Sequence, residues 1–313
     1  MRTSLMLTTL LLAAAGCGPS ARNNGGVDAA DPTGDGALPT VDADTGPCRR
    51  MDFVFVVDDS GSMGEEQTSL GNAFPQFAQV LNDYRISTGQ SLDYRVAVTT
   101  TGRTLKWTIS VLGQTLPMNE TGDNGAFRNT CGMTRRWLER TDPNMASTLT
   151  CRADVGVDGP TFEMPMLTTM MALKERIADG TNAGFLRDDA LLAVVLITDE
   201  DDCSRRDNNF TVSNDHDGCA VVPSELATFL DTVKGGRGRW AAAVVAGPGP
   251  GECSSSFGKA GEAKRLKQFV TAANSGAQQN VVFSSICEGN MAASLTTALN
   301  KFQSACENFP PVE

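Results

Sequence analysis

The feature that most constrains the fold is a set of strand-length segments in which every residue is apolar. They cover residues 53–57, 191–197 and 240–246, with a shorter one at 281–283. A strand that is apolar on both sides must be covered on both faces, as in parallel sheets flanked by helices. Residues 94–98 alternate between apolar and polar instead, so we expect this strand nearer to an edge of the sheet.

Between these segments, apolar residues recur at three- and four-residue spacing, which is typical of helices with one buried face. This spacing predicts helices around residues 70–84, 166–177, 226–233 and 291–302. Pro75 should kink or interrupt the first, because proline lacks an amide hydrogen. Strands alternating with helices predict an α/β fold with a doubly wound, mostly parallel sheet and helices on both faces. Residues 114–160 and 201–221 break the pattern and are expected to be irregular, cysteine-containing insertions.

The N-terminus has the features of an export signal. Arg2 precedes an apolar stretch over residues 5–15, which is too short to cross a bilayer. The stretch ends in Ala-Ala-Gly followed by Cys17, which resembles the lipobox of bacterial lipoproteins, although Ala14 stands where that family more often has leucine. The resemblance implies that residues 1–17 hold a signal peptide and that Cys17 carries the lipid. The alternative is an ordinary secretory signal with an incidental cysteine.

The rest of the chain divides by composition. Residues 18–47 contain few large apolar side chains and many Gly, Asp, Ala, Pro and Thr, which predicts a disordered tether. The folded domain should span residues 48–306, with a short C-terminal tail over 307–313. The lipoprotein resemblance places the protein in the bacterial cell envelope, in contact with the membrane through its anchor only. Gly18 after the cysteine is compatible with the outer membrane.

Eight cysteines remain besides Cys17, and an even number in an exported protein indicates disulfide bonds. Two pairs bracket the polar insertions, and one pair stands at the ends of the domain. The two remaining cysteines, Cys253 and Cys287, each follow an apolar strand. The expected bonds are therefore Cys203–Cys219, Cys48–Cys306, Cys131–Cys151 and Cys253–Cys287. A bond between Cys151 and Cys203 is the alternative.

Composition excludes several functions. The formal net charge is -11, which disfavours nucleic acid as a partner, because phosphates attract Lys and Arg. His216 is the only histidine, so catalysis with a histidine base and multi-histidine metal sites are nearly excluded.

Directly after the first predicted strand stands a D-x-S-x-S motif formed by Asp58, Ser60 and Ser62. A carboxylate and two hydroxyls at alternate positions of a tight loop can converge on one hard cation such as Mg²⁺. Asp199 follows the strand at 191–197, and the carboxyl ends of strands are where open α/β sheets bind ligands. Thr161, just before a predicted helix, offers another hydroxyl. The alternative is that the first three residues only cap the following helix.

This set resembles the metal-ion-dependent adhesion site of von Willebrand factor A domains, over about residues 48–306. Residues 197–204 also resemble cysteine-rich bacterial lipoproteins of this family. The resemblance implies that Ser60, Ser62 and Thr161 bind Mg²⁺ directly, with Mn²⁺ or Ca²⁺ as alternatives. Asp58 and Asp199 would act directly or through water. An open coordination position would then take a carboxylate from a protein or peptide partner.

The expected function is therefore metal-dependent binding at the cell envelope, such as adhesion, and not catalysis. The alternatives are a metal-assisted hydrolase or phosphotransferase and a structural envelope protein with a vestigial metal site. A serine hydrolase has little support, because Ser60 lacks a G-x-S-x-G context. The acidic residues of the insertions, such as Asp201 and Asp202, lack EF-hand spacing and are expected to be solvated rather than to bind calcium.

Overall fold

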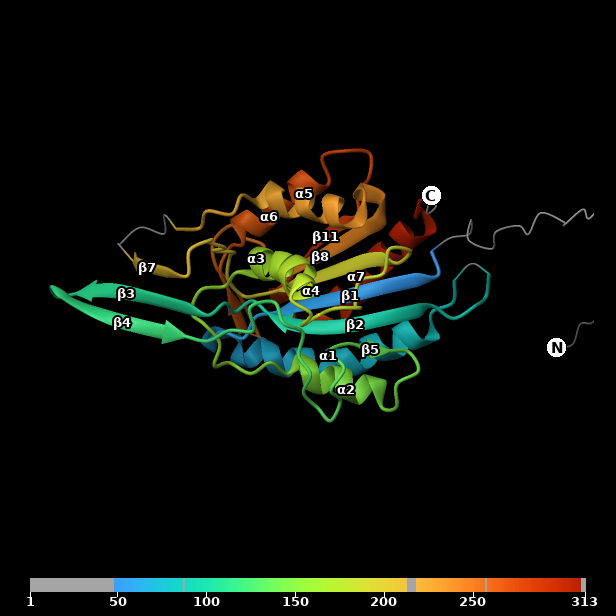
Figure 1. The fold of residues 1–313 in the computed structure, drawn as a ribbon, viewed down its shortest axis with the longest axis horizontal. Coiled ribbons are helices and arrows are strands. Elements are labelled where there is room, and N and C mark those ends of the chain that lie inside the picture. The colour runs from blue at the N-terminus through green and yellow to red at the C-terminus, as the bar shows by residue number, and fades with distance from the viewer. Residues whose placement is uncertain (1–47, 87, 213–217, 257, 311–313) are drawn as a thin grey trace, which may run out of the picture. The chain divides into compact units, whose positions relative to one another are not determined.

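Figure 1 shows a computed structural model of the chain, which describes residues 48–310 except 87, 213–217 and 257. A six-stranded sheet occupies the centre, in the order β11-β8-β6-β1-β2-β5. All neighbours are parallel except β5, which pairs antiparallel with β2. The strands are β1 (Arg50–Val57), β2 (Asp93–Thr100), β5 (Leu138–Glu139), β6 (Leu191–Ile197), β8 (Trp240–Ala246) and β11 (Val281–Ser285).

The order of these strands shows a doubly wound sheet. Starting from β1, the chain adds β2 and β5 on one side, and then returns to add β6, β8 and β11 on the other. The direction of winding therefore reverses between β1 and β6, which are direct neighbours. Such a reversal opens a crevice at the carboxyl ends of the two strands, where sheets of this kind bind ligands.

Two hydrophobic cores lie on opposite faces of the sheet. Phe53, Phe55 and Val57 of β1 belong to one core, and the alternating residues Val54 and Val56 belong to the other. The first core includes α1 (Gly64–Asp83), α2 (Met145–Ala153) and α7 (Met291–Glu307). The second includes α3 (Pro165–Met170), α5 (Pro223–Lys234) and α6 (Lys264–Ala273). The predicted fold class is thus confirmed.

Most predicted elements lie where the apolar patterns placed them, and β2 is next to the edge because only the two-residue β5 lies outside it. The interruption expected at Pro75 is wrong, because α1 runs through it without a break. Pro75 is on the exposed side of the helix, where water can hydrate the carbonyl that loses its hydrogen bond. Phe74 and Phe77 are buried on the other side and hold both halves of the helix against the sheet.

The irregular structure expected for residues 114–160 and 201–221 is also wrong in part. Antiparallel strands β3 (Leu105–Val111) and β4 (Gln114–Glu120) form a hairpin, and β7 (Asn209–Val212) pairs with β3 in parallel. We call this three-stranded sheet the wing; its hairpin extends well beyond the central sheet in Figure 1. The two turn residues, Leu112 and Gly113, both have positive φ angles (50° and 75°), which suits a tight hairpin.

Shorter elements complete the described residues. They are a π turn (Met171–Glu175), α4 (Arg176–Ala178), β9 (Cys253–Ser255), β10 (Gly258–Ala260) and single 3₁₀ turns at Gly61–Met63, Arg237–Arg239 and Ile286–Glu288. The described residues contain four disulfides, in the four pairs expected from the sequence: Cys48–Cys306, Cys131–Cys151, Cys203–Cys219 and Cys253–Cys287.

No helix among the described residues is long and apolar enough to cross a membrane. The predicted signal peptide with Cys17, the tether over residues 18–47, His216 and the end of the predicted tail lie outside the described residues.

Candidate metal centre

The loops that hold the predicted site residues are here called the first (58–62), the second (around Thr161) and the third (around Asp199). The first and the third meet where the direction of winding reverses. β1 and β6 run parallel, with Val57 opposite Ile197, so both strands end at the same edge of the sheet. The amide of Asp58 donates to the carbonyl of Ile197 over 2.9 Å, which extends this pairing into the loops. The residues after β1 and those after β6 are therefore neighbours, as the sequence predicted.

Asp58 is fully buried, and hydrogen bonds fix its carboxylate. Oδ1 accepts from the Ser60 amide at 2.8 Å and from the Thr101 hydroxyl at 3.4 Å. Oδ2 accepts from the Thr198 hydroxyl at 2.6 Å. No side chain caps the 3₁₀ turn that follows or the start of α1, so the helix-cap alternative finds no support here.

The two serines connect this carboxylate to Asp199. Ser60 and Ser62 share a hydrogen bond between their hydroxyls at 3.1 Å, and the Ser62 hydroxyl donates to Asp199 Oδ1 at 3.2 Å. Ser60 and Asp199 are buried, whereas Ser62 is exposed. The structure thus brings four of the five predicted residues together, in a cluster that reaches solvent at Ser62.

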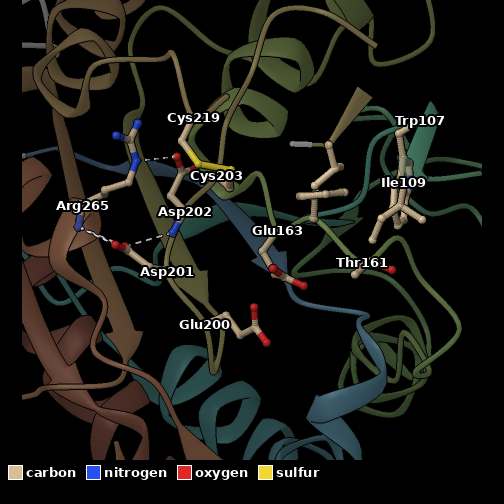
Figure 2. A pocket seen from close by; sticks show the side chains of 12 residues that line it. Trp107, Ile109, Thr161, Glu163, Glu200, Asp201, Asp202, Cys203, Cys219 and Arg265 are labelled. Carbon is tan, nitrogen blue, oxygen red and sulfur yellow. Dashed lines mark hydrogen bonds and ion pairs between the residues drawn. A yellow bond between two sulfur atoms is a disulfide. The ribbon is translucent and has the colours of Figure 1, made fainter. Parts of the chain in front are cut away.

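Thr161, the fifth predicted residue, has other partners. It is exposed, and its hydroxyl donates to Glu120 Oε1 at 2.7 Å, at the end of β4. No hydrogen bond joins it to the cluster among the contacts of the described residues. In Figure 2, Thr161 lies toward the wing, while the carboxyl of Glu163 points into the same space as that of Glu200.

Glu163, in the same second loop, is the buried acid whose charge interacts with the cluster. It is 3% exposed, and the charges of Asp58 and Glu200 act on it. The loop is held against the first one by the Gly159 amide, which donates to the Asp59 carbonyl at 2.7 Å. A Cβ atom at position 159 would lie 2.2 Å from Asp59 Cγ, so this close approach requires glycine. Glu163 was not predicted, because the prediction for this loop relied on a hydroxyl ligand. The signal that could have found it is an acidic residue just before a buried helix.

Burial and mutual repulsion disfavour the ionised form of the acids in this cluster and beside it. Burial first, and then the charge of Asp58, raise the pKa of Asp199 to about 7. Burial, followed by Asp58 and Glu200, raises the pKa of Glu163 to about 10. Burial also raises the pKa of Asp58, and burial with Asp123 raises that of Asp59 to about 7. A cation among these groups would reverse the effect, because it favours the ionised carboxylates.

The donor chemistry fits a hard divalent cation. Carboxylate and hydroxyl oxygens are the ligands that Mg²⁺ and Mn²⁺ take in proteins. Oδ1 of Asp59, beside the cluster, is buried without a hydrogen-bond partner. Among the described residues, there is no group of three or more His, Cys, Asp or Glu side chains that could hold a metal ion without other ligands. The cluster therefore depends on its two serine hydroxyls as well as on its acids.

The acids of the loop that follows Asp199 bind protein groups, and the expectation that they are solvated is wrong for Asp202, which is 1% exposed. The carboxylate of Asp201 accepts from the amides of Arg265 and Leu266 at the start of α6, at 2.9 and 3.2 Å. Asp202 accepts from the Met166 amide at 3.0 Å. Both acids thus stabilise helix N-termini, which accounts for them without calcium.

Comparisons with known proteins give distant structural similarity only. No protein-family model matches the chain. No curated protein matches it either. Proximal thread matrix protein 1 from the mussel byssus, solved with a zinc-occupied MIDAS motif, is 12% identical over 83% of this chain and 46% of its own, with a TM-score of 0.43. Manganese-loaded Plasmodium vivax TRAP protein is 13% identical over 80% of this chain and 74% of its own, with a TM-score of 0.34.

The pilus adhesin SpaC from Lactobacillus rhamnosus GG is 11% identical over 83% of this chain and 30% of its own, with a TM-score of 0.39. The chain thus spans less than half the length of the mussel protein and of this adhesin. At these identities and scores, the similarities assign neither a family nor a function to the chain.

Proposed function

We propose that the domain binds one divalent cation and, through it, a carboxylate of a protein or peptide partner. The observation that carries this proposal is the hydrogen-bonded cluster of Asp58, Ser60, Ser62 and Asp199 at the winding reversal. The cluster combines buried acids with raised pKa values and an exposed hydroxyl, as expected for a cation site that stays accessible to a ligand.

Glu163 is the ligand that the second loop contributes under this proposal, in place of Thr161. Thr161 is bound to Glu120, whereas Glu163 is buried and its carboxyl group lies on the side of Glu200. A third carboxylate would lower the net charge of the loaded site, and so weaken its attraction for an external acid. We therefore expect moderate affinity for the partner, with Mg²⁺ or Mn²⁺ as the resident ion.

Binding is favoured over catalysis by the groups around the cluster. None of the residues that form the cluster is a histidine that could act as a base. The pKa values of Asp58, Asp59, Glu163 and Asp199 are all raised, as expected where acids gather for a cation. An anchor at Cys17 and a location at the cell envelope complete the proposal, and they rest on the lipobox-like sequence alone.

Calorimetric titration with Mg²⁺ and Mn²⁺ tests the site. The wild type should bind one ion, and Ser62→Ala should weaken binding at least tenfold, since it removes a ligand without disturbing the buried core. Unchanged affinity of Ser62→Ala would show that the cluster is not the site.

The second-loop ligand is tested by a matched pair of variants. Glu163→Gln should lower the metal affinity strongly, while Thr161→Ala should leave it within about twofold. The reverse result would return the ligand role to Thr161 and leave the rest of the proposal in place.

A further inference from the structure

The wing has one apolar and one polar face. Residues opposite one another in neighbouring strands share a face, and the register places six apolar side chains on the same one. They are Trp107 and Ile109 of β3, Leu116 and Met118 of β4, and Phe210 and Val212 of β7. The opposite face carries Thr108 and Thr211, whose hydroxyls hydrogen-bond at 2.8 Å. The apolar face of such an amphipathic sheet is expected to be covered by other groups.

The outer half of this apolar face is uncovered. Among the described residues, most exposed large apolar side chains belong to the β3–β4 hairpin. Leu112 at its tip is 100% exposed, and Leu116 and Met118 are 46% and 40% exposed. Apolar side chains gathered in this way on one projecting element mark interaction surfaces, because monomeric proteins rarely expose them together.

The inner half of the face opens into a cavity of about 690 Å³, within the size range of binding pockets. Trp107, Ile109 and Val212 line the wing side of the cavity. Phe162 also lines it and packs edge-on against Trp107, with ring centroids 5.3 Å apart. Nε1 of the buried Trp107 has no hydrogen-bond partner.

The opposite wall belongs to the loops of the candidate metal centre. Glu163 of the second loop and Glu200, next to Asp199, both line the cavity. Figure 2 shows their carboxyl groups on the side away from Trp107 and Ile109. The loops that carry the candidate metal centre therefore also form one wall of the apolar cavity.

The shape and charge of this surface indicate its occupant. The apolar face continues from the cavity to the tip of the hairpin. This surface is longer than a small molecule would need. Pro117 stands in the edge strand β4 and disfavours the addition of another strand, so the occupant lies on the face and not along the edge. Four carboxyl groups line the cavity beside a single base, Arg265, which pairs with Asp202 at 3.7 Å, so an acidic group of the ligand is favoured at the cation rather than in the cavity.

We propose that the apolar face of the wing and its cavity dock an extended segment of a partner polypeptide. The segment places a large apolar side chain in the cavity and a neighbouring carboxylate on the cation. This inference rests on the proposed function, and it adds that the partner must carry a large apolar residue close to its acidic residue.

A displayed peptide library with one fixed Asp and random flanking positions tests the inference. The full chain is immobilised, peptides are bound in Mg²⁺ and released with EDTA. We expect the released peptides to be enriched in Phe, Trp, Leu or Ile at a constant distance from the Asp. Selected peptides should bind the double variant Leu116→Ser/Met118→Ser at least fivefold more weakly. Both substituted side chains are exposed, so the fold should be retained.

Val80→Ser is the matched control, because Val80 is 42% exposed on α1, away from the wing. It should bind the peptides as the wild type does. Metal affinity should be equal in all three proteins, which separates loss of the docking face from loss of the cation.

Three results would overturn the inference. EDTA-released peptides without an apolar preference would leave the metal function standing and remove the role of the wing. Enrichment of Lys or Arg in place of apolar residues would make the cavity a site for cationic side chains. Self-association of the wild type that Leu116→Ser/Met118→Ser abolishes would identify a second copy of the chain as the occupant. Failure of EDTA to release any peptide would instead count against the proposed function itself.

Discussion

Replacing Asp199 with Asn should stabilise the metal-free domain and abolish its response to metal. Burial and Asp58 raise the pKa of Asp199 from its ordinary value of 3.8 to about 7. At roughly 1.36 kcal/mol per pKa unit, this shift corresponds to about 4 kcal/mol. Because the site opens to solvent at Ser62, we take about half of this, or about 2 kcal/mol, as the expected effect. The amide oxygen of Asn can still accept the hydrogen bond from Ser62.

The sign follows from the two protonation states. Below the ordinary pKa, Asp199 is protonated in both the folded and the unfolded chain, so its charge has no effect on stability. As the pH rises toward 7, the unfolded chain ionises freely while the folded protein resists ionisation, and stability is lost. The advantage of Asp199→Asn should therefore be small at pH 4 and complete at pH 8.

Denaturant unfolding at pH 4, 6 and 8 measures this effect, in EDTA and in Mg²⁺. In EDTA at pH 8 the variant should be more stable than the wild type. Mg²⁺ at about 100 times its dissociation constant should add about 2.7 kcal/mol to the wild type only, so the order reverses. Asp207→Asn is the control, because the hydrogen bond from Arg205 lowers the pKa of Asp207, and its loss should not stabilise. A variant less stable than the wild type at pH 8 in EDTA, or an advantage independent of pH, would refute the reasoning.

Three further predictions concern other parts of the chain. Asp52→Ala should destabilise the domain by about 3 kcal/mol in denaturant unfolding, because it leaves the partly buried guanidinium of Arg187 without its 2.8 Å partner. Asp93→Ala, which removes the exposed partner of the same arginine, should cost less than about 1 kcal/mol. Burial raises the pKa of Asp202 to about 6, so its ionisation lowers the stability of the domain as the pH rises from about 4 to 6. Asp202→Asn should reduce this loss of stability, and an unchanged slope of stability against pH would be contrary evidence. Cys17→Ser should release the protein from membranes or leave its signal uncleaved, and wild-type fractionation and processing of this variant would contradict the proposed anchor.

The central sheet could be predicted because each of its strands is recognisable from its own residues. Residues 191–197 and 240–246 are apolar throughout, and only a strand covered on both faces needs that pattern. The loop from Asp58 to Ser62 could also be recognised in the sequence, because its candidate ligands lie within five residues of one another. Asp199 followed from the expectation that parallel strands end at the same edge.

The second loop could not be placed in the same way, because contacts distant in sequence position it. Glu120 from the wing binds Thr161, and the Gly159 amide joins the second loop to Asp59 of the first. The first of these contacts depends on a hairpin that was not predicted. Its turn is Leu112-Gly113, which lacks the usual Asn or Asp at the first position, so the strongest signal for a tight hairpin is absent.

The direction of β1 has a mechanical consequence. Cys48 precedes this strand and Asp58 follows its far end, so the strand leads from the N-terminal side of the domain to the candidate metal centre. Tension between the chain before Cys48 and a partner held at the cation would pull β1 along its own length. Its ladders to β2 and β6 would then be loaded in shear, all hydrogen bonds at once, instead of being unzipped singly. The bond from Cys48 to Cys306 would pass part of that load to α7, so a domain that binds a partner as proposed would resist a pulling force along β1.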